Sequence, residues 1–267
     1  MTIPKLKSHF IYRKLTEEQK RDYTKNGYLY YGRVLTKEGF KKILKECMQV
    51  WLVEKGPFDS NATWLQNALL PNIHHKSETV RRLYFSGPLV DIAEQLIGPN
   101  IKGATSQLTF KMHGDTKTFE WHQDNSYGEL DPYNAITFLI ALDDVNENNG
   151  CLWLIPGSHK NGQIEVGDLG TKKERNKKSE IALDDIDENL AVPIKMQAGD
   201  CLFFHCWMLH QSHGNFSDRD RRILLLRYAD ADAVEVKNNR SPRLGRLLRG
   251  KSTVKEVEFF ENHLPLG

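Results

Sequence analysis

Trp121–His159 reads WHQDNSYGELDPYNAITFLIALDDVNENNGCLWLIPGSH, and this stretch decides the fold. Its short apolar runs are separated by Gly, Asn and Asp, a pattern that predicts antiparallel strands joined by turns. Alternate side chains of an extended strand project to the same face, so we expect His122 and Asp124 to point together while Gln123 faces the other side. One strand end should therefore present an imidazole and a carboxylate side by side.

A third polar ligand is expected from a distant strand. The apolar segment Gly199–His205 leads to His210, far downstream of His122. Two imidazoles and one carboxylate can occupy one face of an octahedral ferrous ion and leave three positions open for a chelating co-substrate and dioxygen. A jelly roll brings such distant strands together. The pattern predicts a non-haem iron oxygenase whose metal ligands are His122, Asp124 and His210.

Two long blocks carry a family resemblance. Trp121–His159 begins with WHQD and ends with ALDD, NGCL and PGSH, and Gly199–Tyr228 contains the pattern H-x-S-x-x-N-x-S followed by paired arginines. Both blocks resemble the phytanoyl-CoA dioxygenase family of iron(II)/2-oxoglutarate oxygenases. Leu15–Val34 is similar to the family's opening helix and first strand, whereas residues 55–85 and 162–190 match poorly and are expected to be substrate-specific. The resemblance implies a mainly β fold with flanking α-helices and a double-stranded β-helix (jelly-roll, cupin-like) core.

The resemblance also implies roles for single residues. Fe²⁺ would be bound by His122, Asp124 and His210. Arg221, eleven residues after His210, would grip the carboxylate of the co-substrate 2-oxoglutarate, and Ser212 would add a hydrogen bond to the same group. The chemistry of arginine also supports this role for Arg221, because a guanidinium binds a carboxylate bidentately and stays charged when buried.

Several nearby side chains compete for these roles. His205 is expected in the wall of the core, hydrogen-bonded to backbone, and His213 in a polar loop. Arg219 remains an alternative anchor for 2-oxoglutarate. Arg222 should face away from Arg221 by strand alternation.

An upstream strand supplies a further candidate. Gln107–Lys111 alternates polar and apolar side chains, which puts Thr109 on a face that either looks into the barrel or is solvated. Family members often hold the co-substrate with a polar residue of this strand, so Thr109 is the candidate. Thr137 and Leu139, one strand further on, are expected to line the pocket.

The resemblance implies a reaction. Oxidative decarboxylation of 2-oxoglutarate with O2 gives succinate and carbon dioxide, and the same oxidant hydroxylates an unactivated C–H bond of a small-molecule metabolite or natural product. The Asp124 carboxylate favours hydroxylation over halogenation, while desaturation, cyclisation and demethylation stay open. Two other classes are a non-catalytic 2-oxoglutarate-binding jelly roll and a zinc hydrolase. Arg221 and Ser212 have no obvious role in a hydrolase.

The substrate is less defined by the sequence. The poorly matching segment before Tyr84 is aromatic and basic, and it would suit a small anionic or zwitterionic molecule if it lines the pocket, or an ordinary surface loop. Its aromatic and basic residues are Trp64, His74, His75, Lys76, Arg81 and Arg82.

Length and composition predict one domain over residues 1–267, with an N-terminal helical buttress of about 1–100 and a jelly-roll core of about 101–267. Residues 162–190 are expected either to cover the pocket mouth as a lid or to form a solvated loop. The chain has 37 basic and 35 acidic residues, which give a formal charge of +2. This balance does not indicate a basic surface for nucleic-acid binding, so we expect no nucleic-acid partner.

The first twenty residues show no apolar h-region, and no apolar run approaches the length of a membrane span, so we expect neither a signal peptide nor a membrane anchor. Its four cysteines show no C-x-x-C pairing, which indicates reduced packing residues. We expect a cytoplasmic monomer or homodimer that acts on a small molecule.

Local signals place three helices. Thr16 begins a capping box, Gly27 should end that helix before a strand over Tyr28–Val34, and Thr36 should cap a second helix. A third helix is expected over Leu89–Ile97.

Overall fold

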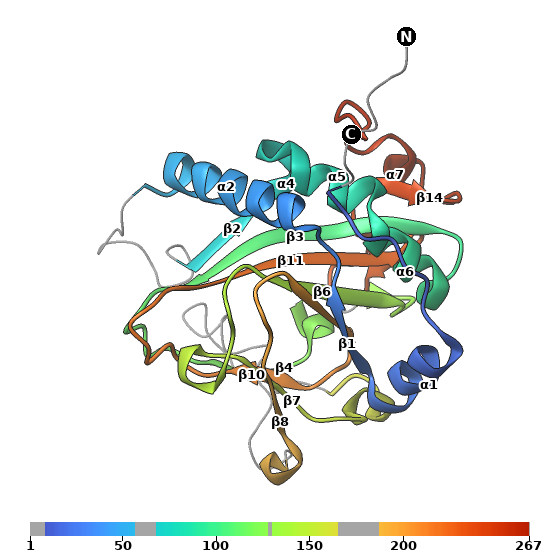
Figure 1. The fold of residues 1–267 in the computed structure, drawn as a ribbon. Helices are drawn as coiled ribbons and strands as arrows, with labels where there is room; N and C mark the ends of the chain where they lie inside the picture. The colour runs from blue at the N-terminus through green and yellow to red at the C-terminus, as the bar shows by residue number, and fades with distance from the viewer. Residues whose placement is uncertain (1–8, 57–67, 128–129, 165–186, 267) are drawn as a thin grey trace.

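A computed structural model describes residues 9–56, 68–127, 130–164 and 187–266 of the chain. Two facing antiparallel sheets form the body, and helices cover the outer face of the larger sheet (Figure 1). The helices are α1 (Glu17–Asn26), α2 (Lys37–Glu54), α4 (Ile73–Lys76), α5 (Glu78–Ser86), α6 (Pro88–Ile97) and α7 (Lys255–Phe259).

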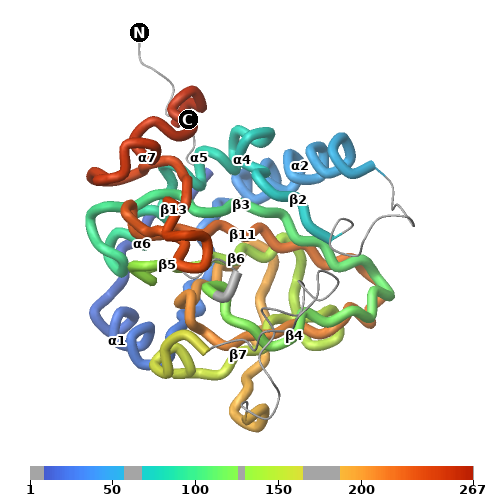
Figure 2. The backbone as a smooth tube through the Cα atoms, turned by 180° about the vertical axis from the view of Figure 1, so that it is seen from behind, coloured from blue at the N-terminus to red at the C-terminus, as the bar shows by residue number. Residues whose placement is uncertain are grey.

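The larger sheet has the order β1-β9-β6-β11-β3-β14, with β2 also paired to β3, and the smaller has the order β4-β10-β7-β8. Figure 2 shows β4 and β7 on the far side of β6, β11 and β3 from the helices. The strands of these two sheets are β1 (Tyr28–Arg33), β2 (Leu69–Pro71), β3 (Ile101–Lys111), β4 (Phe119–His122), β6 (Ala135–Ala141), β7 (Leu152–Leu154), β8 (Val192–Ile194), β9 (Asp200–His205), β10 (His210–Ser212), β11 (Arg221–Asp230) and β14 (Leu247–Arg249).

A small third sheet of order β13-β12-β5 joins strands that lie far apart in the sequence. Its members are β5 (Leu130–Asp131), β12 (Val234–Glu235) and β13 (Ser241–Pro242). All named strand pairs are antiparallel, and the two larger sheets are the layers of a jelly roll. The predicted mainly β fold with a jelly-roll core is confirmed.

Strand β6 shows why a central strand of the larger sheet has a nearly continuous apolar sequence. All seven of its residues are buried, because helices cover one face and the smaller sheet covers the other. Phe138 and Ile140 belong to the cluster under the helices, whereas Leu139 and Ala141 belong to the cluster between the sheets. Because successive side chains of β6 point to opposite faces, this one strand contributes to both hydrophobic clusters.

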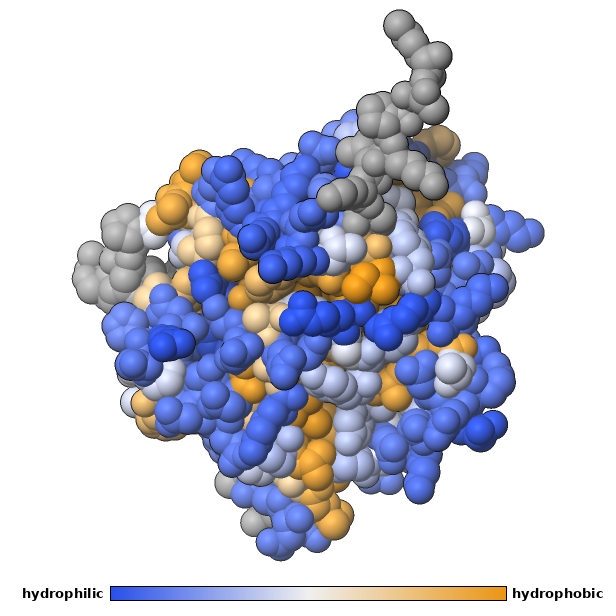
Figure 3. All heavy atoms as spheres, viewed as in Figure 1, coloured by the Kyte–Doolittle hydropathy of each residue, from blue (hydrophilic) through white to orange (hydrophobic). Residues whose placement is uncertain are grey.

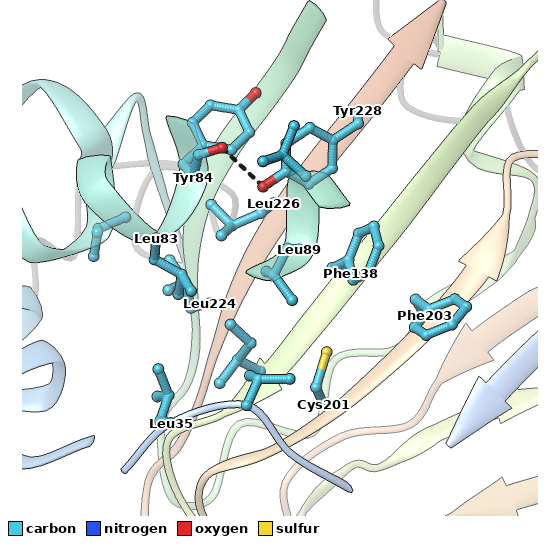
Figure 4. Packing of buried hydrophobic residues seen from close by; sticks show 14 of the residues in the cluster. Leu35, Leu83, Tyr84, Leu89, Phe138, Cys201, Phe203, Leu224, Leu226 and Tyr228 are labelled. Carbon is cyan, nitrogen blue, oxygen red and sulfur yellow. Dashed lines mark hydrogen bonds between the residues drawn. The ribbon is translucent and has the colours of Figure 1, made fainter. Parts of the chain in front are cut away.

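Aromatic side chains join the helical layer to the larger sheet (Figure 4). The Tyr228 hydroxyl on β11 donates to the backbone carbonyl of Tyr84 on α5 at 2.9 Å, and the Tyr84 hydroxyl donates to the carbonyl of Arg227 at 3.0 Å. The two rings lie 5.2 Å apart. Each buried phenol thus has the hydrogen-bond partner that its burial requires.

The predicted opening elements are present. Thr16 and Gln19 form the capping box of α1, and Gly27 ends the helix at φ 79°. A side chain at Gly27 would also clash, because its Cβ would lie 2.3 Å from Nδ1 of His159. Thr36 caps α2 through the amide of Gly39. The third predicted helix, α6, begins one residue earlier than expected.

The two poorly matching segments are only partly described. Residues 57–67, which include Trp64, and residues 165–186 of the expected lid lie outside the described residues. The rest of the first segment forms β2, α4 and α5, of which the two helices belong to the outer layer (Figure 1). The sequence analysis did not predict these elements.

No helix in the described parts of the chain is long and apolar enough to cross a membrane. The face shown in Figure 3 is mostly hydrophilic, with apolar atoms in small patches. All four cysteines are buried and unpaired, as expected of packing residues.

Candidate metal and co-substrate site

The three predicted metal ligands meet between the two large sheets. His122 ends β4 and His210 begins β10, and the two residues are paired across these strands. Asp124 opens the short 3₁₀ helix η1 (Asp124–Tyr127) directly after β4. The ligand atoms of all three residues lie within 4.8 Å of one another, and His210 Nε2 is 3.7 Å from Asp124 Oδ1.

Backbone carbonyls orient both imidazoles. His122 Nδ1 lies 2.6 Å from the carbonyl oxygen of Glu120, and His210 Nδ1 lies 2.9 Å from that of Met208. A carbonyl can only accept, so each Nδ1 carries the ring proton and each Nε2 keeps its lone pair. This arrangement fixes the tautomer that binds a metal through Nε2.

The carboxylate of Asp124 is oriented in the same way. The Thr137 hydroxyl donates to Asp124 Oδ2, while Oδ1 is the oxygen nearest His210. Burial opposes ionisation of Asp124, but the neighbouring His210, Arg227 and His122 outweigh it and lower the pKa of this carboxyl. The Asp124 carboxylate is therefore ionised at neutral pH. Thr137, expected as a pocket residue, contacts the site through this bond.

The histidine on β4 is held in its neutral form. Burial and the adjacent His210 lower the pKa of His122 to about 4. Neutral imidazole is the form that coordinates a metal, so no proton has to leave His122 before an ion binds at neutral pH.

Gln123 faces the other side, as predicted. Its side-chain amide donates to the carbonyls of Gly162 at 2.9 Å and Trp207 at 2.7 Å, and its oxygen accepts from the amide of Ile164. Gln123 thus ties the described start of the 162–190 segment to the metal-binding turn.

Arg221 is a buried cation, and no carboxylate of the described residues forms an ion pair with it. Only 4% of the residue is exposed. Its Nη2 donates to the carbonyl of Gly150 at 2.9 Å, and its Nε has no hydrogen-bond partner. Within the described ranges no carboxylate lies within salt-bridge distance of Arg221, and burial lowers its pKa to about 10. A guanidinium in this position calls for an anionic ligand.

Lys111 is a second buried basic side chain, and its place in the site was not predicted from the sequence. It is the register partner of Arg221 on the neighbouring strand β3. Its ammonium donates to the backbone carbonyls of Ser212, at 2.8 Å, and His213. Burial and the charge of Arg221 lower the pKa of Lys111 to about 6. The only sequence signal was the strand alternation that put Lys111 on the inner face with Thr109.

The two predicted helpers of Arg221 differ in their surroundings. Ser212 is buried two residues after His210 on the same strand, so both side chains share the inner face of β10. Thr109 also lies on an inner face, but its hydroxyl donates to the carbonyl of Ile223 at 3.1 Å. The Thr109 hydroxyl is therefore occupied within the sheet.

The competing residues lie elsewhere. His205 Nδ1 accepts from the amide of Trp207 at 3.1 Å, the backbone bond expected of it. The His213 ring packs against Trp153, 5.7 Å between centroids. The Arg219 side chain is 88% exposed, so it does not reach an enclosed co-substrate.

The arginine next to Arg221 faces away from it, as alternation predicts. Arg222 donates through Nε to Asp143 Oδ2 at 2.7 Å and packs over the ring of Phe110. Asp143 is thus a structural partner of Arg222.

The donor set fits a ferrous ion. Two imidazole nitrogens and one carboxylate oxygen lie close together, which is the set of donors in the facial triad of non-haem iron centres. Ligand atoms bound to one octahedral ion stand about 3 Å apart, so an ion would draw the 3.7 Å pair of His210 and Asp124 slightly together. The Arg221 guanidinium and the neighbouring Lys111 amine fit the distal carboxylate of a chelating dicarboxylate.

Comparisons with known proteins agree with this chemistry. The family model described as phytanoyl-CoA dioxygenase (PhyH) matches residues 23–223. The chain is 30% identical to a probable alpha-ketoglutarate-dependent hypophosphite dioxygenase of Stutzerimonas stutzeri, over 89% of this chain and 87% of the relative. It is 26% identical to the peroxisomal phytanoyl-CoA dioxygenase of Homo sapiens, over 84% of this chain and 71% of the relative.

A solved structure gives the same picture. The non-heme alpha-ketoglutarate-dependent carbocyclase SnoK from nogalamycin biosynthesis superposes with a TM-score of 0.69 at 25% identity, covering 89% of this chain and 95% of that chain. The cupin-like jelly roll predicted from the sequence is the fold of these oxygenases.

Proposed function

Because the chain belongs to the phytanoyl-CoA dioxygenase family, we propose that it hydroxylates an unactivated C–H bond of a small molecule. The chain is an iron- and 2-oxoglutarate-dependent oxygenase. The observation that carries the finer proposal is the cluster of His122, Asp124 and His210, together with a buried arginine, Arg221, that has no carboxylate partner among the described residues.

In this proposal His122, Asp124 and His210 hold the iron. When bound, the iron with 2-oxoglutarate and O2 supplies the oxidising power for C–H cleavage, with succinate and carbon dioxide as co-products. The carbonyls of Glu120 and Met208 keep the imidazole tautomers correct before any ion arrives. An intact carboxylate at Asp124 fills a coordination position that halogenation would need for halide.

The co-substrate is held by Arg221, Lys111 and Ser212. The Arg221 guanidinium binds the distal carboxylate of 2-oxoglutarate, and Lys111 adds a second positive charge across the strand pair. Ser212 follows His210 on β10, its backbone carbonyl accepts from Lys111 Nζ at 2.8 Å, and its side chain adds a hydroxyl. Thr109 was a candidate for the same role, but its hydroxyl bond to Ile223 leaves it to shape the wall beside the co-substrate.

The apolar wall between the sheets has its own part in the reaction. Leu139, Phe204 and Ile223 are buried there, and the Phe204 ring lies 4.7 Å from the His210 ring. Such a lining excludes water from the reacting centre, which protects a reactive oxidant from unproductive decay. It also leaves the substrate C–H bond as the group that reacts.

A small substrate is supported by the relative of Stutzerimonas stutzeri, which is named as a hypophosphite dioxygenase, since hypophosphite is a small anion. We propose a small molecule rather than a fatty acyl-CoA. The basic segment before Tyr84 is not part of this proposal. Its residues His74 and His75 bond to Glu261 in the outer layer.

Two other classes are separated from this proposal by particular residues. A zinc hydrolase needs the three ligands but gives Arg221 and Lys111 no role. A non-catalytic 2-oxoglutarate-binding protein would not need intact iron ligands with oriented tautomers.

Isotopically labelled dioxygen tests the proposed outcome. The iron-loaded protein is incubated with 2-oxoglutarate and a panel of small metabolites that includes phosphorus oxyanions, and succinate is measured alongside product mass. The metabolite that stimulates succinate formation is the substrate, and its hydroxylation puts one labelled oxygen into the product. A product that has lost two hydrogens and carries no labelled oxygen would show that the reaction is desaturation or cyclisation instead of hydroxylation.

A further inference from the structure

A second cluster of ligand-type side chains lies on the outer face of the larger sheet. His74 and His75 of α4 and Glu261, just after α7, place their ligand atoms within 4.8 Å of one another. Both ribbon views place α7 beside the helical layer (Figures 1 and 2). We propose that these three residues bind a divalent cation of the Zn²⁺ class and that this ion ties the C-terminal segment to the helical layer.

The distances are close to those of a tetrahedral site. His74 Nε2 lies 3.2 Å from Glu261 Oε2, and ligand atoms around tetrahedral zinc stand about 3.3 Å apart. His75 Nε2 lies 2.6 Å from the other carboxylate oxygen, Oε1, and this hydrogen bond has to give way when Nε2 binds the ion. The His75 side chain can make this adjustment because 38% of it is exposed. The same exposure gives water access as the fourth ligand.

A buried hydroxyl supports the imidazole of His74 from behind. His74 Nδ1 lies 2.5 Å from Oγ of Ser106, a fully buried residue of β3. When Nε2 takes the ion, the ring proton resides on Nδ1 and is donated to Ser106. Such an outer partner is a regular feature of metal-binding histidines.

The protonation states suit a cation. Burial lowers the pKa of His74, so the ring is neutral at neutral pH. Burial disfavours the Glu261 carboxylate, but hydrogen bonds from His74 and His75 outweigh this effect and lower its pKa. The cluster therefore offers two neutral imidazoles and one negative charge, a set that zinc accepts.

Two arginines fix the backbone on both sides of the cluster. Arg81 donates to the carbonyl of His74 at 3.0 Å, and Arg246 donates to the carbonyls of Glu261 and Leu264. Glu261 also has φ 55°, a left-handed conformation that is uncommon for a non-glycine residue. Both guanidinium groups bind main-chain oxygens and leave the ligand atoms to the ion.

Equilibrium dialysis of the untagged full chain against Zn²⁺, with metal measured by mass spectrometry, tests the site. Wild type should hold two zinc ions per chain, one in this cluster and one at the proposed iron ligands. His75→Ala should hold one. Asp124→Ala should also hold one, because it removes only the other site. His113→Ala is the matched control, since it removes a 70% exposed histidine that pairs with Asp220 away from the cluster, and it should keep two.

The outcomes separate this proposal from that for the iron site. Wild-type zinc content in His75→Ala, together with loss of zinc in Asp124→Ala, would overturn the second site and leave the first intact. If His75→Ala does not fold, Glu261→Gln keeps the shape and hydrogen bonding of the side chain but removes its charge, and it should lose the same zinc ion. Cobalt(II) gives a second readout: an intense tetrahedral absorption should be present in Asp124→Ala and absent in His75→Ala.

Discussion

His122 and His210 are direct partners across β4 and β10, and their ring centroids are 4.1 Å apart. This pairing brings together two residues that are distant in the sequence and sets the spacing of the proposed iron ligands. Register therefore matters more than the local sequence around His210: a slip by one residue would turn its imidazole to the other face.

Replacing Asp124 by Ala should abolish iron binding and turnover. The substitution removes the only charged ligand of the proposed iron site. The two remaining imidazoles alone should bind ferrous iron too weakly to keep it bound at the protein concentration of the experiment. Iron per chain, measured by mass spectrometry after anaerobic loading, should fall from one to near zero. Asp144→Ala is the control, because the Asp144 carboxylate caps the amide of Ala198 and should leave iron content unchanged.

Arg221→Ala should weaken 2-oxoglutarate binding and spare iron. Loss of one partner of a buried charged pair corresponds to roughly a hundredfold rise in the KM for 2-oxoglutarate. Arg222→Ala removes the neighbouring guanidinium, which faces away and binds Asp143, so its KM should stay at the wild-type value. Equal KM values for wild type and Arg221→Ala would reject the arginine assignment.

Lys111 should make co-substrate binding depend on pH. Its pKa is lowered to about 6, so the ammonium of the ligand-free protein loses its proton as pH rises through that value. The protonated form attracts the 2-oxoglutarate dianion, and affinity should therefore fall as pH increases from 5.5 toward 8 in wild type. In Lys111→Met the affinity should be lower and nearly constant over the same range. A dependence of equal slope in both proteins would assign it to another group.

Thr137→Val should lower iron affinity without removing the site. The change is close to isosteric and deletes only the hydroxyl that donates to Asp124 Oδ2. Loss of such an outer partner reduces metal affinity by about tenfold or more. A competition titration with a chelator would measure it, and Thr105→Val, whose hydroxyl bonds its neighbour's carbonyl, serves as the control.

Zinc should silence the enzyme. Zn²⁺ fits the same ligands but has no redox chemistry, so an oxygenase loaded with zinc cannot decarboxylate 2-oxoglutarate. Succinate formation should vanish when zinc replaces iron and return after exchange to iron. Hydrolytic activity of the zinc form in the absence of oxygen would favour the metal-hydrolase class instead.

Much of the site could be predicted because strand alternation and the family pattern agree. The H-x-D spacing placed His122 and Asp124 together and Gln123 opposite, although Asp124 opens a 3₁₀ helix rather than continuing the strand. Lys111 was not assigned, since a lysine in an alternating strand usually indicates a solvated face. Lys111 is placed beside Arg221 by the register of β3 with β11, and the register of two distant strands cannot be read from the sequence.

The outer cluster could not be predicted for a similar reason. His75 and Glu261 are 186 residues apart, and no local pattern links α4 to the segment after α7. The helices α4 and α5 were not predicted from the sequence either, because α4 is a single turn and α5 is short. Contacts between distant short elements depend on tertiary packing rather than on propensity.

An anaerobic absorption titration tests the central claim most directly. Ferrous iron is added to the apoprotein, and 2-oxoglutarate is then titrated while the visible spectrum is recorded. A weak metal-to-ligand charge-transfer band should appear in wild type, require higher 2-oxoglutarate concentrations in Arg221→Ala, and be absent in Asp124→Ala. Wild-type protein that binds one iron per chain but shows no band at saturating 2-oxoglutarate would contradict the assignment of His122, Asp124, His210 and Arg221 to one active site.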